Sequence, residues 1–203
     1  MPRITSKQSR RLGLNLSGRE KDGFVKRPYP PGILDSQRKH KSNRTEFGSQ
    51  LKAKQIVRIS YGLREKQFSG YVLKAMDSKD KTTTPAERVF KTLESRLDNV
   101  VYRSGLAHVR ALARQIVAHG HITVNGKRVL SASYQVKPGD IVGIREGSKK
   151  SALFTHSHDK LKGYKTPAWM KLDSDKLQIT ITGTATEIEP IFDLASVIEF
   201  YSR

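Results

Sequence analysis

The stretch Glu94–Glu146, ESRLDNVVYRSGLAHVRALARQIVAHGHITVNGKRVLSASYQVKPGDIVGIRE, decides the fold of this chain. It predicts two basic amphipathic helices followed by a tight β-hairpin. Arg96 and Arg103 are seven residues apart in the first helix, so the two side chains are expected on one face. Arg110 and Arg114 are one turn apart in the second helix.

The hairpin is marked by Asn125-Gly126 between alternating apolar residues, which is typical of a two-residue turn. Lys127 and Arg128 follow this turn directly. Residues 137–140 (KPGD) predict a second turn that leads into a strand. Cationic groups on neighbouring elements suit a phosphate backbone, because it is a regular array of negative charge. The stretch therefore favours RNA as its partner.

Charge is distributed unevenly along the 203 residues. Of the net charge of +19, residues 1–90 carry +13 and residues 91–150 carry +7, whereas residues 151–203 carry −1. Such a gradient indicates a polyanionic partner for the first three quarters of the chain. Solubility alone does not explain it, since a net charge of about 2–8 suffices for a small domain.

Composition excludes several classes of protein. The chain has no cysteine, so disulfides, thiolate catalysis and cysteine-ligated zinc are ruled out. No apolar run approaches the ~20 residues that cross a bilayer, and the N-terminus lacks the apolar core of a signal peptide. The first 19 residues are somewhat Arg- and Ser-rich, so a transit peptide stays open as a minor alternative.

The pattern upstream of this stretch changes near Gly48. Residues 1–46 are rich in Lys, Arg, Ser, Gly and Pro without an apolar period, and RPYPPG at 27–32 forbids a helix. We expect an extended arm that becomes ordered on its partner. After Gly48 the apolar residues predict a short basic helix and a second helix around 68–76.

Thr84, Pro85 and Glu87 form the clearest helix start in the chain. Thr84 can cap the N-terminus, Pro85 suits the first helical position and Glu87 can complete a capping box. Apolar residues then recur at three- and four-residue spacing, which predicts one long helix ending near Gly105. The following helix is expected to end at Gly120, in a left-handed C-cap.

The last quarter carries weaker signals. Residues 146–166 resemble a polar loop, and QITIT at 178–182 predicts a strand. Residues 195–201 form either a helix or a strand, a choice that periodicity does not decide.

Several motifs lie in the order and spacing of a known family. They are ESRLDNVVYR at 94–103, ARQIV at 113–117, ITVNG at 122–126, SYQV at 133–136, GDI at 139–141, KRPYPPG at 26–32, YGLREKQF at 61–68 and EFYSR at 199–203. Together they closely resemble the bacterial small-subunit ribosomal protein four family, which gives its name to an RNA-binding module found in several RNA enzymes. The resemblance covers nearly the whole chain and is weakest over 146–190.

This resemblance implies an α+β fold with four parts. They are an extended basic arm over 1–47, an all-helical domain over 48–93 joined by 190–203, an RNA-binding module of two helices and an antiparallel hairpin sheet over 94–157, and a loop-and-strand extension over 158–189.

It also implies a structural, non-enzymatic constituent of the small subunit in the cytoplasmic ribosome. Such a protein binds rRNA early in assembly, at a multi-helix junction of the 5′ domain. In the family, the path along which mRNA enters the subunit faces the basic region that corresponds to Lys39, Lys41, Arg44, Lys52 and Lys54, and the C-terminal part meets small-subunit protein five. The resemblance permits a second role as a repressor that binds the protein's own messenger.

The expected RNA contacts are cations of the arm, the helical domain and the module, and we expect no membrane, small-molecule substrate, metal or cofactor. These cations are Arg10, Arg11, Lys26, Arg27, Lys39, Lys41, Arg44, Lys52, Lys54, Arg58, Arg64, Lys66, Arg96, Arg103, Arg110, Arg114, Lys127 and Arg128.

The chain departs from the family pattern in two places. Many members carry zinc-binding cysteines before the PYPPG run, so their absence here predicts a metal-free arm. The family usually starts its second module helix with a capping box, but Val109 and Leu112 occupy those positions, at a cost of about 1 kcal/mol. Leu112 would instead widen the buried stripe. RNA contact is therefore favoured for Arg114 over Arg110.

Other interpretations also fit these residues. The module arginines could be solvated helix faces, and Tyr29, Tyr61 and Phe68 could stack on bases, although packing is favoured for the last two. An RNA-modifying enzyme that uses the module as an accessory is the runner-up.

Two apparent catalytic or metal signals are weak. Arg-Leu-Asp at 96–98 also occurs at the catalytic aspartate of pseudouridine synthases, but here we expect it at the surface of the module's own helix. The pairs His119/His121 and His156/His158 have no cysteine or carboxylate at ligand spacing, so no metal site is predicted.

Overall fold

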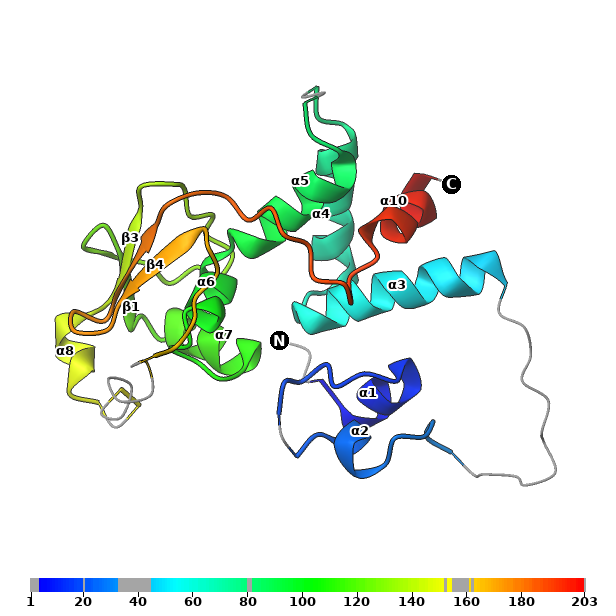
Figure 1. Ribbon diagram of the computed structural model, residues 1–203, viewed down its shortest axis with the longest axis horizontal. Coiled ribbons are helices and arrows are strands. Elements are labelled where there is room, and N and C mark those ends of the chain that lie inside the picture. The colour runs from blue at the N-terminus through cyan, green and yellow to red at the C-terminus, as the bar shows by residue number, and fades with distance from the viewer. Residues whose placement is uncertain are drawn as a thin grey trace. The chain divides into compact units, whose positions relative to one another are not determined.

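The computed structural model describes residues 4–19, 21–32, 45–79, 82–151, 153, 154, 161 and 163–202. They fall into two compact units, residues 1–89 with 188–203 and residues 90–187. The first unit is helical, and the second combines helices with an antiparallel sheet (Figure 1). The expected α+β class is therefore confirmed.

The described residues form the following helices and strands, from the N-terminus to the C-terminus. They are α1 (Ser6–Leu12), α2 (Gly23–Lys26), α3 (Glu46–Ser60), α4 (Glu65–Met76), α5 (Pro85–Glu94), α6 (Leu97–Arg103), α7 (Arg110–Ala118), β1 (Ile122–Val124), β2 (Lys127–Arg128), β3 (Ile141–Ile144), α8 (Glu146–Lys149), β4 (Met170–Asp173), β5 (Gln178–Ile181) and α10 (Leu194–Ser202). Within the described residues, no helix is both long and apolar enough to span a bilayer.

The N-terminal segment contains the short helices α1 and α2, which contact each other. The Asp22 carboxylate is buried and accepts hydrogen bonds from the Ser9 hydroxyl at 3.1 Å, the Ser17 hydroxyl at 2.5 Å and the Phe24 amide at 2.8 Å. Leu12 is buried beside this network. The expectation of an extended arm is therefore wrong for α1 and α2, which are helical and are joined by polar contacts.

The C-terminal helix α10 packs on α3 and α4 (Figure 1). Gln50 Nε2 donates to a carboxylate oxygen of Glu199 at 3.1 Å, which ties α3 to α10. The ring of Phe68 lies 6.2 Å from that of Tyr201. Tyr61 and Phe68 are both buried, which agrees with packing rather than exposed stacking. The helix also resolves the choice that periodicity left open for residues 195–201.

Helix α5 begins with the predicted capping box. The Glu87 amide donates to the Thr84 hydroxyl at 3.2 Å, and the Thr84 amide donates to the Glu87 carboxylate at 3.2 Å. This reciprocal pair satisfies two amides that a helix start leaves without partners. The cap and the first helical position of Pro85 are confirmed.

The single long helix predicted after this cap is wrong. Helix α5 ends at Glu94, and α6 begins at Leu97. The chain between them pairs with residues 132–136: the Leu97 amide donates to the Tyr134 carbonyl at 2.8 Å, and the Val136 amide donates to the Ser95 carbonyl at 2.9 Å. A backbone that forms these bonds cannot also continue the helical ladder, so the helix breaks here.

The sheet of the second unit has the order β2-β1-β3-β5-β4, and its neighbouring strands are antiparallel. Asn125 and Gly126 connect β1 to β2 with φ values of +49° and +80°. A type I′ hairpin turn needs positive φ at both of these positions. The predicted hairpin is confirmed, as are the turn closed by the Asp140 amide on the Lys137 carbonyl and the strand over 178–181.

Helices α6 and α7 lie beside one face of the sheet, and the core of the second unit fills the space between them (Figure 1). Fully buried members of this core include Leu97, Val101, Ala113, Val117, Ile122, Val142 and Ile179. Alternation along the strands and the 3.6-residue period along the helices direct these side chains to one interior.

Helix α7 starts and ends as its sequence predicts. Val109 is its N-cap and makes no side-chain capping bond, while Leu112 packs against the core. Gly120 follows the helix with φ +75°, which confirms the left-handed C-terminal cap. Part of the expected polar loop forms a short helix, α8.

Candidate nucleic-acid interface

The strongest candidate site is a cationic surface on α6 and α7, here called the basic face, made by Arg103, Arg110 and Arg114. All three side chains are partly exposed. Arg103 and Arg110 donate hydrogen bonds to Glu94 and Asn99, and Arg114 lies 4.0 Å from the Asp98 carboxylate, within the same compact unit.

Arg110 is the first residue of α7 and lies across α6. Its Nε donates to Asn99 Oδ1 at 2.9 Å, and its guanidinium lies 4.3 Å from the centre of the Tyr102 ring. Stacking on an aromatic ring suits a planar guanidinium and fixes the plane of the group. The structure thus gives Arg110 a defined orientation despite the missing capping box.

Arg103 ends α6 and pairs with Glu94 at the end of α5. Its Nε and Nη2 each donate to a carboxylate oxygen of Glu94 at 2.9 Å. This fork geometry is the strongest arrangement that an arginine and a carboxylate can adopt. The Glu94 side chain is only 2% exposed, whereas that of Arg103 is 18% exposed.

Arg96 differs from the other arginines of this region because its side chain is fully buried. Its Nε and Nη2 donate to the two oxygens of Asp98 at 3.0 and 2.7 Å. The expectation that Arg96 and Asp98 lie at the surface is wrong: the helix break makes Arg96 the N-cap of α6 and turns its side chain inward. Asp98 also lies 4.0 Å from Nη1 of Arg114, which is partly exposed.

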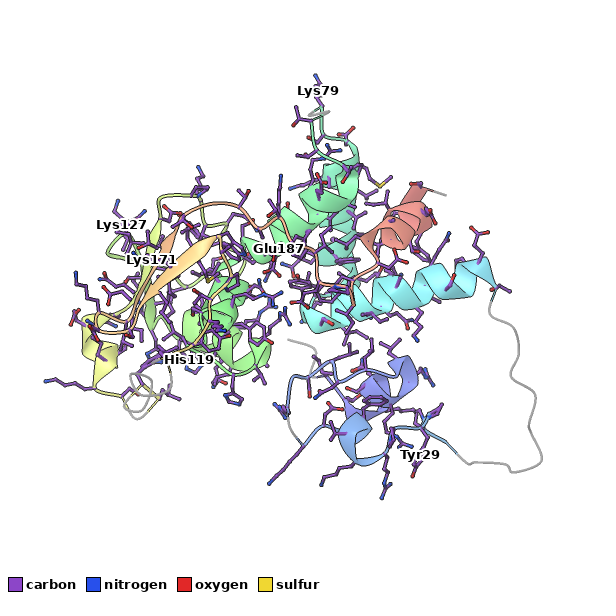
Figure 2. All side chains as sticks on the ribbon, in the orientation of Figure 1. Tyr29, Lys79, His119, Lys127, Lys171 and Glu187 are labelled. Carbon is purple, nitrogen blue, oxygen red and sulfur yellow. The ribbon has the colours of Figure 1, made fainter. Side chains whose placement is uncertain are left out.

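The hairpin adds two exposed cations, and Figure 2 shows the Lys127 side chain projecting from the sheet. Arg128 Nη2 donates to the carbonyl of His119 at 3.2 Å, at the C-terminal end of α7. The Arg128 side chain crosses Gly120 so closely that a Cβ there would lie 2.1 Å from its Nε. Arg128 is thus anchored at the end of α7, whereas the Lys127 side chain is exposed to solvent.

The helical unit holds a second group of predicted cations around Glu65. Lys54 Nζ and Arg58 Nε lie 3.0 and 3.2 Å from its carboxylate oxygens, and the Tyr201 hydroxyl donates to it at 2.7 Å. Burial raises the pKa of Glu65, but the hydrogen bonds from Tyr201 and Lys54 and the charges of Lys54 and Arg58 outweigh it and lower that pKa below its usual value. Burial, followed by the Glu65 contact, raises the pKa of Tyr201.

The other predicted cations of the helical unit line the outside of α3 and α4. Lys52 is half-buried, whereas Arg64 and Lys66 are exposed beside the start of α4.

In the arm, Arg10 donates to the carbonyls of Tyr29 and Pro30 at 3.0 and 3.2 Å, and its guanidinium lies 4.7 Å from the centre of the Tyr29 ring. Arg11, Lys26 and Arg27 are exposed. Figure 2 labels Tyr29 in this segment. Its ring forms a cation–π contact with Arg10. Lys39, Lys41 and Arg44 lie outside the described residues.

Sequence reasoning missed the acceptors that orient the basic face. Glu94, Asp98 and Asn99 alternate with the arginines in ESRLDNVVYR, and that alternation of charge was the available signal. The arrangement offers fixed cations and hydrogen-bond donors, which can bind phosphate. Among the described residues, no group of three or more His, Cys, Asp or Glu side chains could hold a metal ion.

A two-layer α/β unit with guanidinium groups on its helical face has the features of a nucleic-acid-binding module. Residues 95–142 match the S4 domain, and residues 3–94 match the ribosomal protein S4/S9 N-terminal domain.

Curated relatives match over nearly the full length. The small ribosomal subunit protein uS4 of Latilactobacillus sakei is 42% identical over 199 residues, 97% of this chain and 96% of the relative. That of Cutibacterium acnes is 40% identical over 200 residues, 98% of this chain and 96% of the relative. The chain belongs to the uS4 family of ribosomal proteins, as its motifs predict, and it is a structural, non-enzymatic protein with an S4 RNA-binding domain.

Proposed function

We propose that this chain is a structural constituent of the small ribosomal subunit that binds rRNA early in assembly, at a multi-helix junction of the 5′ domain. Three partly exposed arginines on one helical face of the S4 domain carry this proposal, and hydrogen bonds orient two of them, Arg103 and Arg110. As a member of a family whose relatives are bacterial ribosomal proteins, the chain is expected to work in the ribosome of the cytoplasm.

Recognition by shape suits this surface. The base edges of an A-form helix are hidden in a deep groove, so a protein distinguishes a folded junction by the spacing of its phosphates. Oriented guanidinium groups on a rigid unit respond to that spacing. Exposed Lys127 and Arg128 on the hairpin extend the same unit with further phosphate contacts.

Arg96 has another role in this proposal. Its buried ion pair with Asp98 leaves no surface for RNA, so we assign Arg96 to the interior of the module rather than to the contact. Arg103, Arg110 and Arg114 remain proposed RNA contacts.

The rest of the chain supports further contacts in the subunit. The exposed cations Arg11, Lys26 and Arg27 suit additional rRNA. The region where mRNA enters is proposed to face the basic segment around Lys39, Lys41, Arg44, Lys52 and Lys54. Residues 151–203 carry a net charge of −1, which suits a protein neighbour, and we propose small-subunit protein five. Binding of the protein's own messenger would use the same basic face, so rRNA and messenger would compete for it.

Binding of the full chain to the 5′ domain of small-subunit rRNA, measured against a structured RNA of the same length across a salt series, tests the proposal. Electrostatic contact lowers log K by about 0.7–0.9 per neutralised phosphate as log salt rises, for both RNAs. We expect rRNA to bind roughly a hundredfold more tightly and to retain that margin at high salt. Equal affinities that fall together would leave a general basic binder and refute the proposal.

A further inference from the structure

Two buried carboxylates lie directly behind the basic face. Glu94 is 2% exposed and Asp98 is 5% exposed. By charge alone, negative groups beside phosphate-binding arginines should weaken RNA binding, because they repel the phosphates and partly neutralise the cations. Their contacts indicate a different effect.

Glu94 determines where the Arg103 guanidinium points. Two parallel bonds of 2.9 Å fix both the position and the plane of that group. A flexible arginine loses rotamer freedom when it binds phosphate, and an arginine that is already fixed loses less.

Asn99 does the same for Arg110 without carrying a charge. Its Oδ1 accepts from Arg110 Nε at 2.9 Å, and its Nδ2 donates to the backbone carbonyl of Glu94 at 3.3 Å. Asn99 is itself buried, so its amide is fixed by both bonds. The Tyr102 ring supports the guanidinium from the other side.

Asp98 is the third acceptor. Its two oxygens are held by buried Arg96, and the oxygen that accepts from Arg96 Nη2 lies 4.0 Å from Arg114 Nη1. The charge of Arg114 is thus attracted toward a carboxylate that two bonds from Arg96 hold.

The backbone that carries these acceptors is anchored on a second segment of the module. Its amides and carbonyls form hydrogen bonds with residues 132–136. One of them runs from the Asp98 backbone amide to the Ala132 carbonyl at 3.2 Å. The acceptors therefore stand on a fixed support rather than on a mobile loop.

We propose that Glu94, Asp98 and Asn99 are positioning residues that hold the basic face in its phosphate-binding arrangement, so that the two carboxylates strengthen RNA binding instead of weakening it. This inference rests on the proposed function of the basic face. Charge alone predicts the opposite effect of the two carboxylates on RNA affinity.

The test compares two identical substitutions in the full chain, binding to 5′-domain rRNA. Glu94→Gln removes a carboxylate behind the basic face and one of its two bonds to Arg103. Glu146→Gln removes a carboxylate whose side chain is 86% exposed and pairs only at the surface with Lys149. We expect Glu94→Gln to weaken binding roughly tenfold, the usual effect of one lost hydrogen bond to a charged group, and Glu146→Gln to leave it unchanged or slightly tighter.

Asn99→Ala keeps the inference testable if Glu94→Gln fails to fold. It changes no charge, and we expect a similar, roughly tenfold loss of affinity. Because both variants retain every cation, the slope of log K against log salt should stay at the wild-type value. Tighter binding by Glu94→Gln, or wild-type affinity of folded Asn99→Ala, would overturn the inference.

A variant with Arg103, Arg110 and Arg114 all changed to alanine separates this inference from the proposed function. If the basic face binds rRNA, the salt slope falls by about 2 in this variant. An unchanged slope and affinity would refute the basic face and the positioning role together. A reduced slope with unaffected Glu94→Gln and Asn99→Ala would refute the positioning role alone.

Discussion

The guanidinium of Arg96 and the carboxylate of Asp98 form a two-point ion pair, with contacts of 3.0 and 2.7 Å, in the interior of the second unit. Arg96 is the largest fully buried side chain among the described residues. A buried ion pair of this kind costs desolvation of both groups, so each partner depends on the other.

Removal of one partner should destabilise the protein strongly. Arg96→Met leaves Asp98 buried with only the more distant Arg114 nearby, and we expect the free energy of unfolding to fall by about 3–5 kcal/mol. Urea unfolding followed by circular dichroism measures this loss. The double variant Arg96→Met/Asp98→Leu should lose less than Arg96→Met alone. Wild-type stability of Arg96→Met would contradict a structural role for the pair.

The capping box of α5 provides a smaller, local prediction. Thr84→Ala removes the hydroxyl that accepts from the Glu87 amide and should lower the free energy of unfolding by about 1 kcal/mol. Thr184→Ala is the matched control, because Thr184 is exposed and lies outside the helices and strands. Urea midpoints of the two variants that differ by less than their error would show that the cap contributes nothing.

The close approach of Arg128 to Gly120 leads to a third prediction. Gly120→Ala places a Cβ 2.1 Å from Arg128 Nε, at a residue with φ +75°. The substitution should therefore lower the free energy of unfolding by more than about 1 kcal/mol. It should also displace the Arg128 side chain from the His119 carbonyl. Gly147 lies in α8, and a Cβ added there would meet no atom within 4 Å. Gly147→Ala should therefore be neutral or should stabilise the protein by up to about 1 kcal/mol. Thermal unfolding of both variants checks the contrast, and equal effects would refute it.

The lowered pKa of Glu65 predicts a pH-dependent contribution to stability. Since the folded pKa lies below the unfolded value, near 4.5, the contribution is present above that value and is lost as pH falls through the folded pKa. The difference in unfolding free energy between wild type and Glu65→Gln should be below about 1 kcal/mol at pH 7, because the side chain is half-exposed, and should shrink as the pH falls below about 4.5. A difference that grows on acidification would contradict the assignment.

Local signals in the sequence predicted local structure correctly. The cap at Thr84 and the turn at Asn125-Gly126 depend on residues within three or four positions, and both form as expected. The break between α5 and α6 depends instead on residues 132–136, some forty positions away, so helical periodicity continued through it. The inward turn of Arg96 follows from that break and could not be read from spacing alone.

The N-terminal segment escaped prediction for a related reason. Apolar periodicity detects hydrophobic cores, whereas Ser9, Ser17 and Asp22 build a polar one. Serine and aspartate in a basic, glycine-containing segment suggest disorder by composition. Their mutual hydrogen bonds appear only when the two short helices are brought together.

Charge reversal at Arg114 tests the central claim, that the basic face binds rRNA, most directly. Arg114→Glu and Lys176→Glu reverse one partly or fully exposed cation each within the second unit, and unfolding confirms that each variant is folded. Affinity for the 5′ domain of small-subunit rRNA is then measured at one salt concentration. We predict that Arg114→Glu loses at least tenfold more affinity than Lys176→Glu, because a guanidinium in the contact is replaced by a charge that phosphate repels. Equal losses for the two folded variants would contradict the account.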